Sequence, residues 1–160
     1  MTKNKCNSMK NKKVLVVGLG NSGKAAVQAM VKLGACVSVQ DSKHEEDVEP
    51  QLRTFLEDKH VTCYFGTVPE DMASFDILIL SPGVPPGLDF INEAKAAGAE
   101  IIGELEIAYR VGRGNYVAIT GTNGKTTTTT LVGEIYKAAG KTTYVVGNIG
   151  VAVISKALIS

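Results

Sequence analysis

The sequence predicts an α/β protein with a Rossmann-like parallel-sheet first domain, followed by the beginning of a P-loop domain. Short apolar runs alternate with amphipathic stretches along most of the chain, which is typical of a parallel sheet covered by helices. A G-x-G-x-x-G motif at 18–23 follows the first apolar run, and a second glycine-rich turn occupies 121–127. Each turn stands between a predicted strand and a predicted helix, where such turns bind phosphate groups.

The composition excludes several classes of protein. The 17 Lys and Arg residues nearly balance the 16 Asp and Glu residues, so net charge gives no argument for binding nucleic acid or an anionic membrane. No apolar run approaches the length of a membrane span. The three cysteines lack metal-ligand spacing, which favours a reduced, cytosolic protein. Residues 1–12 are rich in lysine, and we predict a disordered basic tail there.

The first domain is expected over residues 13–103. Strands are predicted at 12–17, 36–40, 61–65, 76–80 and 100–102, and helices at 50–59, at 89–97 and between the G-x-G-x-x-G motif and Gly34. The helix before Gly34 should bury one apolar face, formed by Ala25, Ala26, Val27, Ala29, Met30 and Leu33.

The G-x-G-x-x-G motif indicates a nucleotide site in this domain. Asp41 follows the second strand about twenty residues after the glycines, where a dinucleotide fold places the carboxylate that holds a ribose. The proline-rich turn Ser81–Gly87 follows the fourth strand, and ligands of open α/β sheets bind at the carboxyl ends of strands. Two simpler interpretations stay open. The glycines would only allow close packing, or the proline turn would be a stiff connection without a ligand.

The second glycine-rich turn predicts ATP binding. Its backbone N–H groups suit phosphate oxygens, Lys125 supplies charge for the β- and γ-phosphates, and the Thr126 hydroxyl can complete the shell of a Mg²⁺ ion. The predicted ATP contacts are Gly121, Thr122, Asn123, Gly124, Lys125, Thr126 and Thr127. Because Ile119 stands where G-x-x-x-x-G-K-[ST] has its first glycine, an ordinary turn with a solvated lysine is the alternative.

Residues 104–160 are interpreted as an incomplete, P-loop ATP-binding central domain. Strands are predicted at 116–120 and 142–146 around a helix at 125–139, before the turn Gly147-Asn-Ile-Gly150. A phosphate-loop domain needs further strands to cover its sheet and an acidic Mg²⁺ partner on a later strand. We therefore expect the chain to be the amino-terminal part of a longer protein and to be inactive by itself.

Together these motifs resemble the amino-terminal third of a Mur ligase. The matching segments are V-L-V-V-G-L-G-N-S-G-K at 14–24, L-S-P-G-V-P at 80–85, G-E-L-E at 103–106, A-I-T-G-T-N-G-K-T-T-T-T-T at 118–130 and G-N-I-G at 147–150. The resemblance covers essentially the whole chain after the tail. It implies a cytoplasmic ligase of peptidoglycan synthesis that uses ATP and Mg²⁺ and is a monomer at full length. Its first domain would hold the uridine-diphosphate end of the substrate.

Within the family, the similarity is greatest to members that join D-glutamate to UDP-N-acetylmuramoyl-L-alanine through an acyl phosphate. By position, the family's uridine and diphosphate contacts fall on Leu19, Gly20, Asp41, Ser42, Ser81 and Gly83. Lys125 and Asn148 match its catalytic positions, and a turn-forming role for Asn148 stays open. Lys43 stands near a position where some members have an arginine that contacts uracil.

Other assignments remain at this point. Another Mur ligase or a folylpolyglutamate-synthetase-like ligase would share the ATP loop. An NAD-dependent dehydrogenase would use the first glycine motif and Asp41 but would leave 121–127 unexplained. A non-catalytic nucleotide-binding module would use 121–127 and treat the first domain as a scaffold.

Overall fold

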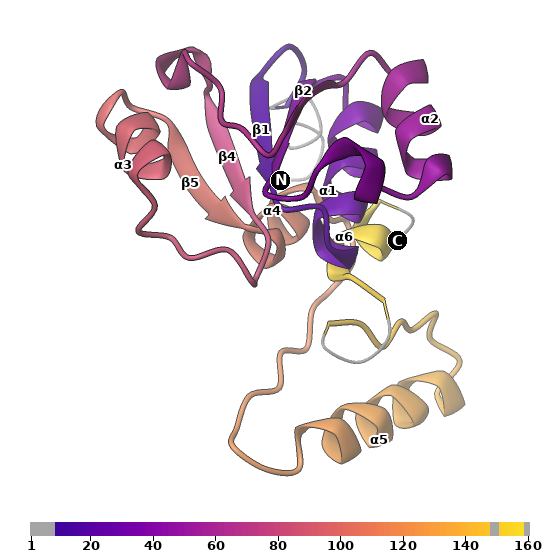
Figure 1. Cartoon of the computed structure of the whole chain (residues 1–160). Helices are drawn as coiled ribbons and strands as arrows, with labels where there is room; N and C mark the ends of the chain where they lie inside the picture. Colours follow the sequence, from indigo (N-terminus) through magenta and orange to yellow (C-terminus); the bar gives the residue numbers. More distant parts are fainter. Residues whose placement is uncertain (1–8, 148–150, 159–160) are drawn as a thin grey trace.

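The centre of the protein is a five-stranded parallel sheet in the order β3-β2-β1-β4-β5 (Figure 1). The computed structural model describes residues 9–147 and 151–158. The strands are β1 Lys13–Val17, β2 Cys36–Asp41, β3 Thr62–Phe65, β4 Ile77–Leu80 and β5 Glu100–Gly103. All pairings between neighbouring strands are parallel, so the predicted Rossmann-like α/β arrangement is confirmed.

Helices cover both faces of the sheet. The helices described are α1 Asn21–Lys32, α2 Pro50–Asp58, α3 Asp89–Ala96, α4 Glu104–Val111, α5 Lys125–Ala138 and α6 Val153–Ala157, with the short 3-10 helices η2 Glu45–Asp47 and η3 Met72–Ser74. Of these, α5 lies away from the sheet (Figure 1). Side chains of α1, α2, α4 and α6 share one core cluster, and those of α3 and η3 share the other. None of the helices described is both long enough and apolar enough to cross a bilayer.

The middle strand, β1, is buried on both faces. Val14 and Val16 belong to the cluster under α1, whereas Leu15 and Val17 belong to the cluster under α3. Successive side chains of a strand point to opposite faces, so an uninterrupted apolar run is what a covered parallel strand requires. This burial explains why the apolar run was a reliable signal for the strand.

The predicted apolar face of α1 is confirmed. The face is buried at Ala25, Ala26, Val27, Ala29 and Met30, and Leu33 packs partly buried against the same cluster. Gly34 has φ +77°, a left-handed conformation that glycine adopts without strain. Its N–H donates to the carbonyl of Val31 at 3.0 Å, which ends the helix where predicted.

The folded part of the chain includes the end of the predicted tail. Of the predicted disordered residues 1–12, residues 1–8 lie outside the described residues. Met9 is only 5% exposed and belongs to the core. The N–H of Asn11 donates to the carbonyl of Gly34 at 2.9 Å, and Lys12 forms an ion pair with Asp76 at 3.1 Å. Residues 9–12 are therefore part of the ordered structure.

The predicted strands at 116–120 and 142–146 are wrong. Both segments are described, and neither pairs with another strand. A strand forms only where another backbone satisfies its N–H and C=O groups, and no described segment pairs with either of them. Residue Val145 lies against α5 instead, since a Cβ built on Gly133 would be 2.5 Å from its side chain.

The close approach of α1 to the end of β1 generates a stability prediction. A Cβ at Gly23 would lie 1.8 Å from the carbonyl oxygen of Gly18, whereas a Cβ at Gly20 would meet nothing within 4 Å. We expect Gly23→Ala to lower the free energy of unfolding by about 1–3 kcal/mol or more, because α1 must shift. Gly20→Ala should stay within about 0.5 kcal/mol of the parent. Urea denaturation followed by circular dichroism measures both, and equal losses would contradict the packing argument.

Candidate functional site

Three loops meet where β1, β2 and β4 end. Because β1 pairs with β2 on one side and with β4 on the other, the loops that follow these parallel strands lie next to one another at one edge of the sheet. These loops carry the predicted uridine and diphosphate contacts, namely Leu19 and Gly20 after β1, Asp41 and Ser42 at the end of β2, and Ser81 and Gly83 after β4. The fold therefore brings all six positions to the same edge of the sheet, and the region between these three loops is here called the crevice.

Asp41 connects the first two loops. One carboxylate oxygen accepts a hydrogen bond from the N–H of Leu19 at 2.5 Å, and the other accepts one from the N–H of Lys43 at 2.9 Å. The residue is only 8% exposed, so these charge-assisted bonds form in a partly dry environment where they are strong. A carboxylate has about four acceptor sites, which leaves capacity for a ligand donor.

Ser81 connects the third loop to the first. Its hydroxyl donates to the carbonyl of Gly18 at 2.8 Å, and its N–H donates to the carbonyl of Val17 at 3.0 Å. Gly18 has φ +87°, a conformation that favours glycine. The turn that follows, Ser81–Gly87, contains prolines at 82, 85 and 86. Hydrogen bonds therefore join the loops of the crevice to one another.

Exposed backbone lies at the start of α1 and in the turn after β4. Gly20 is the N-cap of α1, with no side-chain cap bond and no acidic residue in the first turn of the helix. Gly20, Ser42 and Gly83 are exposed, and a Cβ at either glycine would meet no other atom within 4 Å. The first N–H groups of a helix lack intrahelical partners and carry partial positive charge. This arrangement suits an anion with several oxygens.

Cationic side chains flank this end of α1. Lys24 forms an ion pair with Glu49 at 2.7 Å. Lys43 lies close enough to attract the Glu49 carboxylate electrostatically. The hydrogen bond and charge of Lys24, with a smaller effect of Lys43, hold the pKa of the Glu49 carboxyl below its ordinary value. The pair was not predicted from the sequence, because a contact between a helix and a distant loop leaves no local pattern.

The second glycine-rich turn bends through two glycines with positive φ and leads directly into a helix. Gly121 and Gly124 have φ of +149° and +74°, and α5 begins directly after Gly124. The Lys125 ammonium donates to the carbonyls of Gly121 and Thr122, which lie in its own loop. All seven predicted ATP contacts at 121–127 are exposed, and the first turn of α5 holds no acidic residue. These features fit a triphosphate and a Mg²⁺ ion beside Thr126.

The two predicted ligand regions remain apart in the structure. No recorded hydrogen bond or ion pair among the described residues joins 121–127 to the crevice, and α5 lies away from the sheet (Figure 1). Asn148, the other predicted catalytic residue, lies outside the described residues. In the described ranges, no three His, Cys, Asp or Glu side chains cluster as a metal site would require, so the magnesium assignment rests on Thr126.

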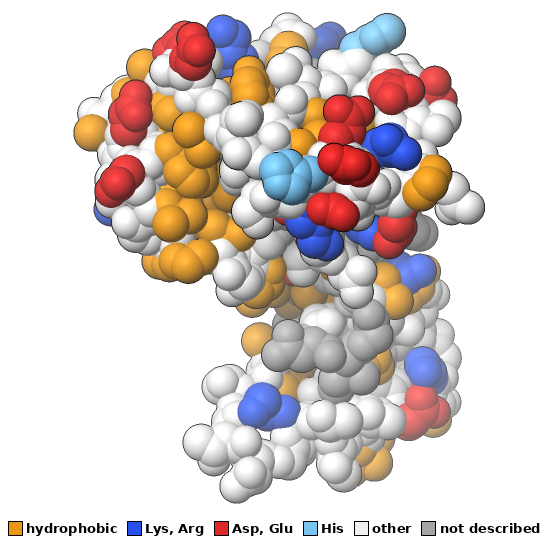
Figure 2. Space-filling view, viewed as in Figure 1, with side chains coloured by type: hydrophobic (Ala, Val, Ile, Leu, Met, Phe, Trp, Pro, Cys, Tyr) orange, Lys and Arg blue, Asp and Glu red, His pale blue; other side chains and the backbone are white. Residues whose placement is uncertain are grey.

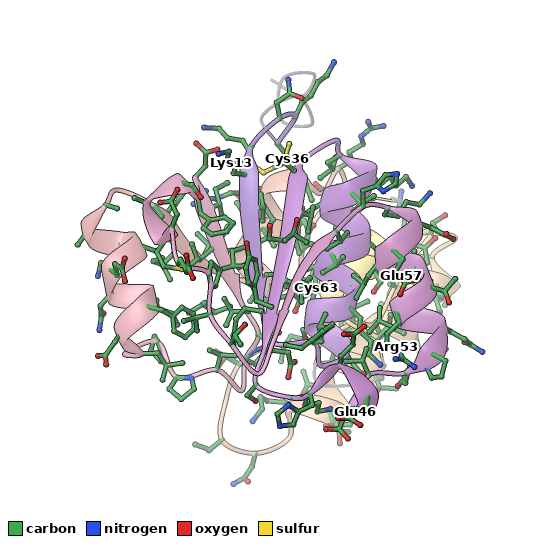
Figure 3. All side chains as sticks on the ribbon, turned by 45° about the horizontal axis from the view of Figure 1, so that its top comes forward. Lys13, Cys36, Glu46, Arg53, Glu57 and Cys63 are labelled. Carbon is green, nitrogen blue, oxygen red and sulfur yellow. The ribbon has the colours of Figure 1, made fainter. Side chains whose placement is uncertain are left out.

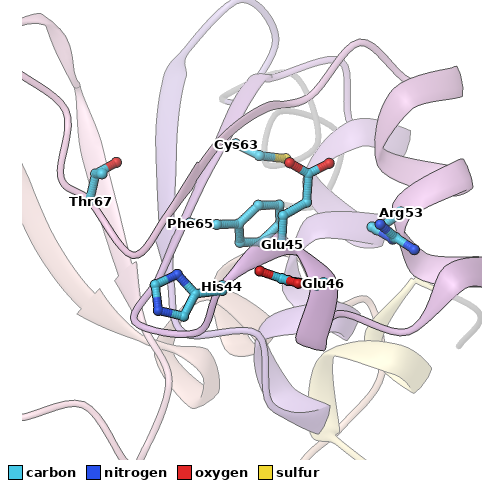
Figure 4. Close-up of a pocket in the computed structure, with 7 residues that line it drawn as sticks. All are labelled: His44, Glu45, Glu46, Arg53, Cys63, Phe65 and Thr67. Atoms are coloured by element: carbon cyan, nitrogen blue, oxygen red, sulfur yellow. The ribbon is translucent and has the colours of Figure 1, made fainter.

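A separate hollow lies at the β3 edge of the sheet. Its volume is about 570 Å³, and it is lined by His44, Glu45, Glu46, Arg53, Cys63, Phe65 and Thr67 (Figure 4). Acidic side chains gather over this part of the surface (Figure 2). Glu46 lies in η2, and Arg53 and Glu57 lie in α2, away from the strand starts at Lys13 and Cys36 (Figure 3). Burial raises the pKa of the Cys63 thiol, which makes it a poor nucleophile. None of the predicted site residues lines this hollow.

Known proteins resemble this chain over most of its length. The family model described as Mur ligase MurD-like, N-terminal domain, matches residues 12–103. The chain is 51% identical over 154 residues to "UDP-N-acetylmuramoylalanine--D-glutamate ligase" of Alkaliphilus oremlandii (strain OhILAs), which covers 94% of this chain and 34% of the relative. The protein of the same name from Clostridioides difficile (strain 630) is 45% identical over 147 residues, 91% of this chain and 33% of the relative.

The chain spans about a third of the length of the curated relatives it matches. Among solved structures, the PH0520 protein from Pyrococcus horikoshii OT3 superposes with a TM-score of 0.42 at 20% sequence identity. That superposition covers 60% of this chain and 27% of the other.

The bonds of Asp41 predict how a substitution there would act. Asn offers one acceptor oxygen where Asp41 uses two, so Asp41→Asn leaves one of the Leu19 and Lys43 N–H groups without its acceptor. We expect a loss of about 1–3 kcal/mol in the free energy of unfolding, with shifted amide resonances for Leu19 and Lys43. Asp47→Asn removes the same charge from an exposed site and serves as the control. Unchanged resonances in Asp41→Asn would contradict the assigned role.

Proposed function

The chain belongs to the Mur ligase MurD-like N-terminal-domain family, and on this premise we propose that it is part of an ATP-dependent ligase that adds D-glutamate to UDP-N-acetylmuramoyl-L-alanine. The observation that carries the proposal is the crevice at the ends of β1, β2 and β4, where three fastened loops surround the open start of α1. The printed names of the relatives support the choice of substrates. We also propose a cytoplasmic protein that is a monomer at full length.

The crevice would hold the uridine-diphosphate end of the substrate. The diphosphate would lie at the start of α1, beside the backbone of Leu19 and Gly20. The first N–H groups of a helix have no intrahelical partners, and together with the helix dipole they favour negative charge there. Asp41 and Ser42 would contact the nucleoside, since Asp41 retains acceptor capacity for N–H or O–H donors. Gly83 and the Ser81 backbone would close the opposite side.

The phosphate loop would hold ATP. Glycine at 121 and 124 allows the backbone to bend around the phosphates. The Lys125 ammonium, which hydrogen-bonds to loop carbonyls, can turn to the β- and γ-phosphates without leaving a buried group unpaired, because it is exposed. Thr126 would place its hydroxyl on Mg²⁺, which when bound neutralises phosphate charge.

The proposed reaction couples ATP cleavage to formation of an amide bond. A carboxylate oxygen of the substrate attacks the γ-phosphorus and ADP leaves, which gives an acyl phosphate. The amine of D-glutamate then attacks the acyl carbon, loses a proton and displaces inorganic phosphate. Lys125 and Asn148 would stabilise the charge that develops on the transferred group, a role that depends on positioning and electrostatics.

Ligand titration tests the proposal. The 160-residue chain should bind UDP-N-acetylmuramoyl-L-alanine, with shifts of the amide resonances of Leu19 and Gly20. Affinity should be modest, because much of the ligand would stay in water. NAD is the matched alternative, since a G-x-G-x-x-G turn followed by Asp41 also fits a dinucleotide. Tighter binding of NAD would favour a dehydrogenase and would overturn the assignment.

Lys125 is the residue whose loss should affect the chemistry most. In the protein extended to the length of its relatives, Lys125→Ala should lower kcat by about 10²–10³-fold, because it removes charge needed in the transition state. Thr129→Ala should change little, since the Thr129 hydroxyl donates to the carbonyl of Lys125 at 2.7 Å within α5. ADP release dependent on D-glutamate measures both variants. Near-parental turnover in Lys125→Ala would show that the loop has another role.

A further inference from the structure

A buried carboxylate lies outside both ligand regions, at the start of α4. Glu104 is only 9% exposed, and its Oε1 accepts a hydrogen bond at 2.8 Å from the N–H of Ile154. Ile154 is 50 residues further along the chain and lies in the first turn of α6. The bond therefore joins the beginning and the end of the segment that carries the phosphate loop.

The position of Glu104 makes the buried charge tolerable. A buried carboxylate is costly unless it is hydrogen-bonded, and the N–H groups at a helix start have no partners within the helix. Glu104 is the first residue of α4, and its carboxylate satisfies one such N–H, that of Ile154 in the first turn of α6. No buried side-chain polar atom of the described residues lacks a partner.

Apolar contacts hold α6 in the same place. Val153, Ile154 and Ala157 are 8%, 1% and 4% exposed and belong to the same core cluster as Ile107 and Ala108 of α4. Helix α6 packs on α1 as well as on α4 (Figure 1). Burial of the Ile154 side chain removes apolar surface from water, so this short helix is held by packing as well as by the hydrogen bond.

The start of the phosphate-loop segment also contacts α4. The Tyr116 hydroxyl donates to the carbonyl of Ala108 at 2.9 Å, and its ring contacts Tyr109 edge to face. At the returning end, the Lys156 ammonium of α6 lies 5.3 Å from the centre of the Tyr144 ring. Residues 117–147 are therefore anchored on α4 at one end and on α6 at the other, and α6 itself packs on α4.

We infer that Glu104 is a positioning residue whose carboxylate holds α6 on α1 and α4 and so fixes the phosphate-loop segment relative to the crevice. Helix α1 then positions both ligand regions. Its first turn lies at the crevice, and its surface packs against α6, which holds the returning end of the phosphate-loop segment. The inference goes beyond the proposed function, since it concerns the geometry between two regions whatever nucleotide each of them binds.

Hydrogen exchange tests the contact itself. In the 160-residue chain, Glu104→Ala should make the amides of α6 exchange about 10- to 100-fold faster, as expected for loss of a hydrogen bond to a charged group. Amides of β1 and β4 should keep their protection. Glu104→Gln retains an acceptor oxygen and should restore most of the α6 protection. Glu106→Gln is the control, because Glu106 is exposed and pairs only within α4, with Arg110.

Distances between spin labels test the positioning role. One label is attached to the exposed Cys36 and the other to Leu131→Cys on the exposed face of α5, after Cys6→Ser and Cys63→Ala remove the other thiols. The parent, Glu104→Gln and Glu106→Gln should give the same narrow distance distribution. Glu104→Ala should give a broad one, because α6 no longer anchors the returning chain.

Two results would overturn the inference. The first is an unchanged α6 exchange rate in Glu104→Ala, and the second is an unchanged distance distribution. If Glu104→Ala unfolds the sheet, Ile154→Ala replaces it, because that variant removes the largest apolar anchor of α6 and leaves Glu104 in place. A narrow distribution in Ile154→Ala would then refute the role of the α4–α6 contact.

Discussion

The contact between Gly23 and the carbonyl oxygen of Gly18 sets the geometry on which the crevice depends. With no side chain at Gly23, α1 starts directly against the residue that follows β1, and its first N–H groups have no partners within the helix. The carbonyl oxygen of Gly18 also accepts a hydrogen bond from the Ser81 hydroxyl. The same oxygen atom therefore positions the loop after β4. Asp41 then fastens the second loop to Leu19. A shift of α1 would disturb every one of these contacts.

The sequence predicted the parts of the fold in which burial leaves a local pattern. The strands of the sheet were visible because apolar runs such as Val14–Val17 are covered on both faces, and the face of α1 followed from its helical period. The two wrong strands have similar apolar runs, but a run forms a strand only when a partner satisfies its backbone. That condition depends on tertiary structure and leaves no local trace.

The candidate site could also be predicted only in part from the sequence. Leu19, Asp41 and Ser81 could be placed at one edge because parallel strands end together. The buried state of Asp41, its double role as acceptor and the pairing of Lys24 with Glu49 could not be predicted, since each depends on the approach of distant segments. The bond from Ile154 to Glu104 could not be predicted either, because it depends on the return of the chain at α6, 50 residues later.

The prolines of the turn after β4 reduce the conformational entropy that the crevice loops would lose on binding a ligand. Each proline ring fixes φ and removes conformations that a flexible loop would have to lose when a ligand arrives. The glycine loop opposite is restrained as well, by its bonds to Asp41 and Ser81. Little ordering entropy is then left to oppose binding. Discrimination between ligands at this edge of the sheet should therefore depend on shape and charge in a preorganised site, with rapid association and little loop closure.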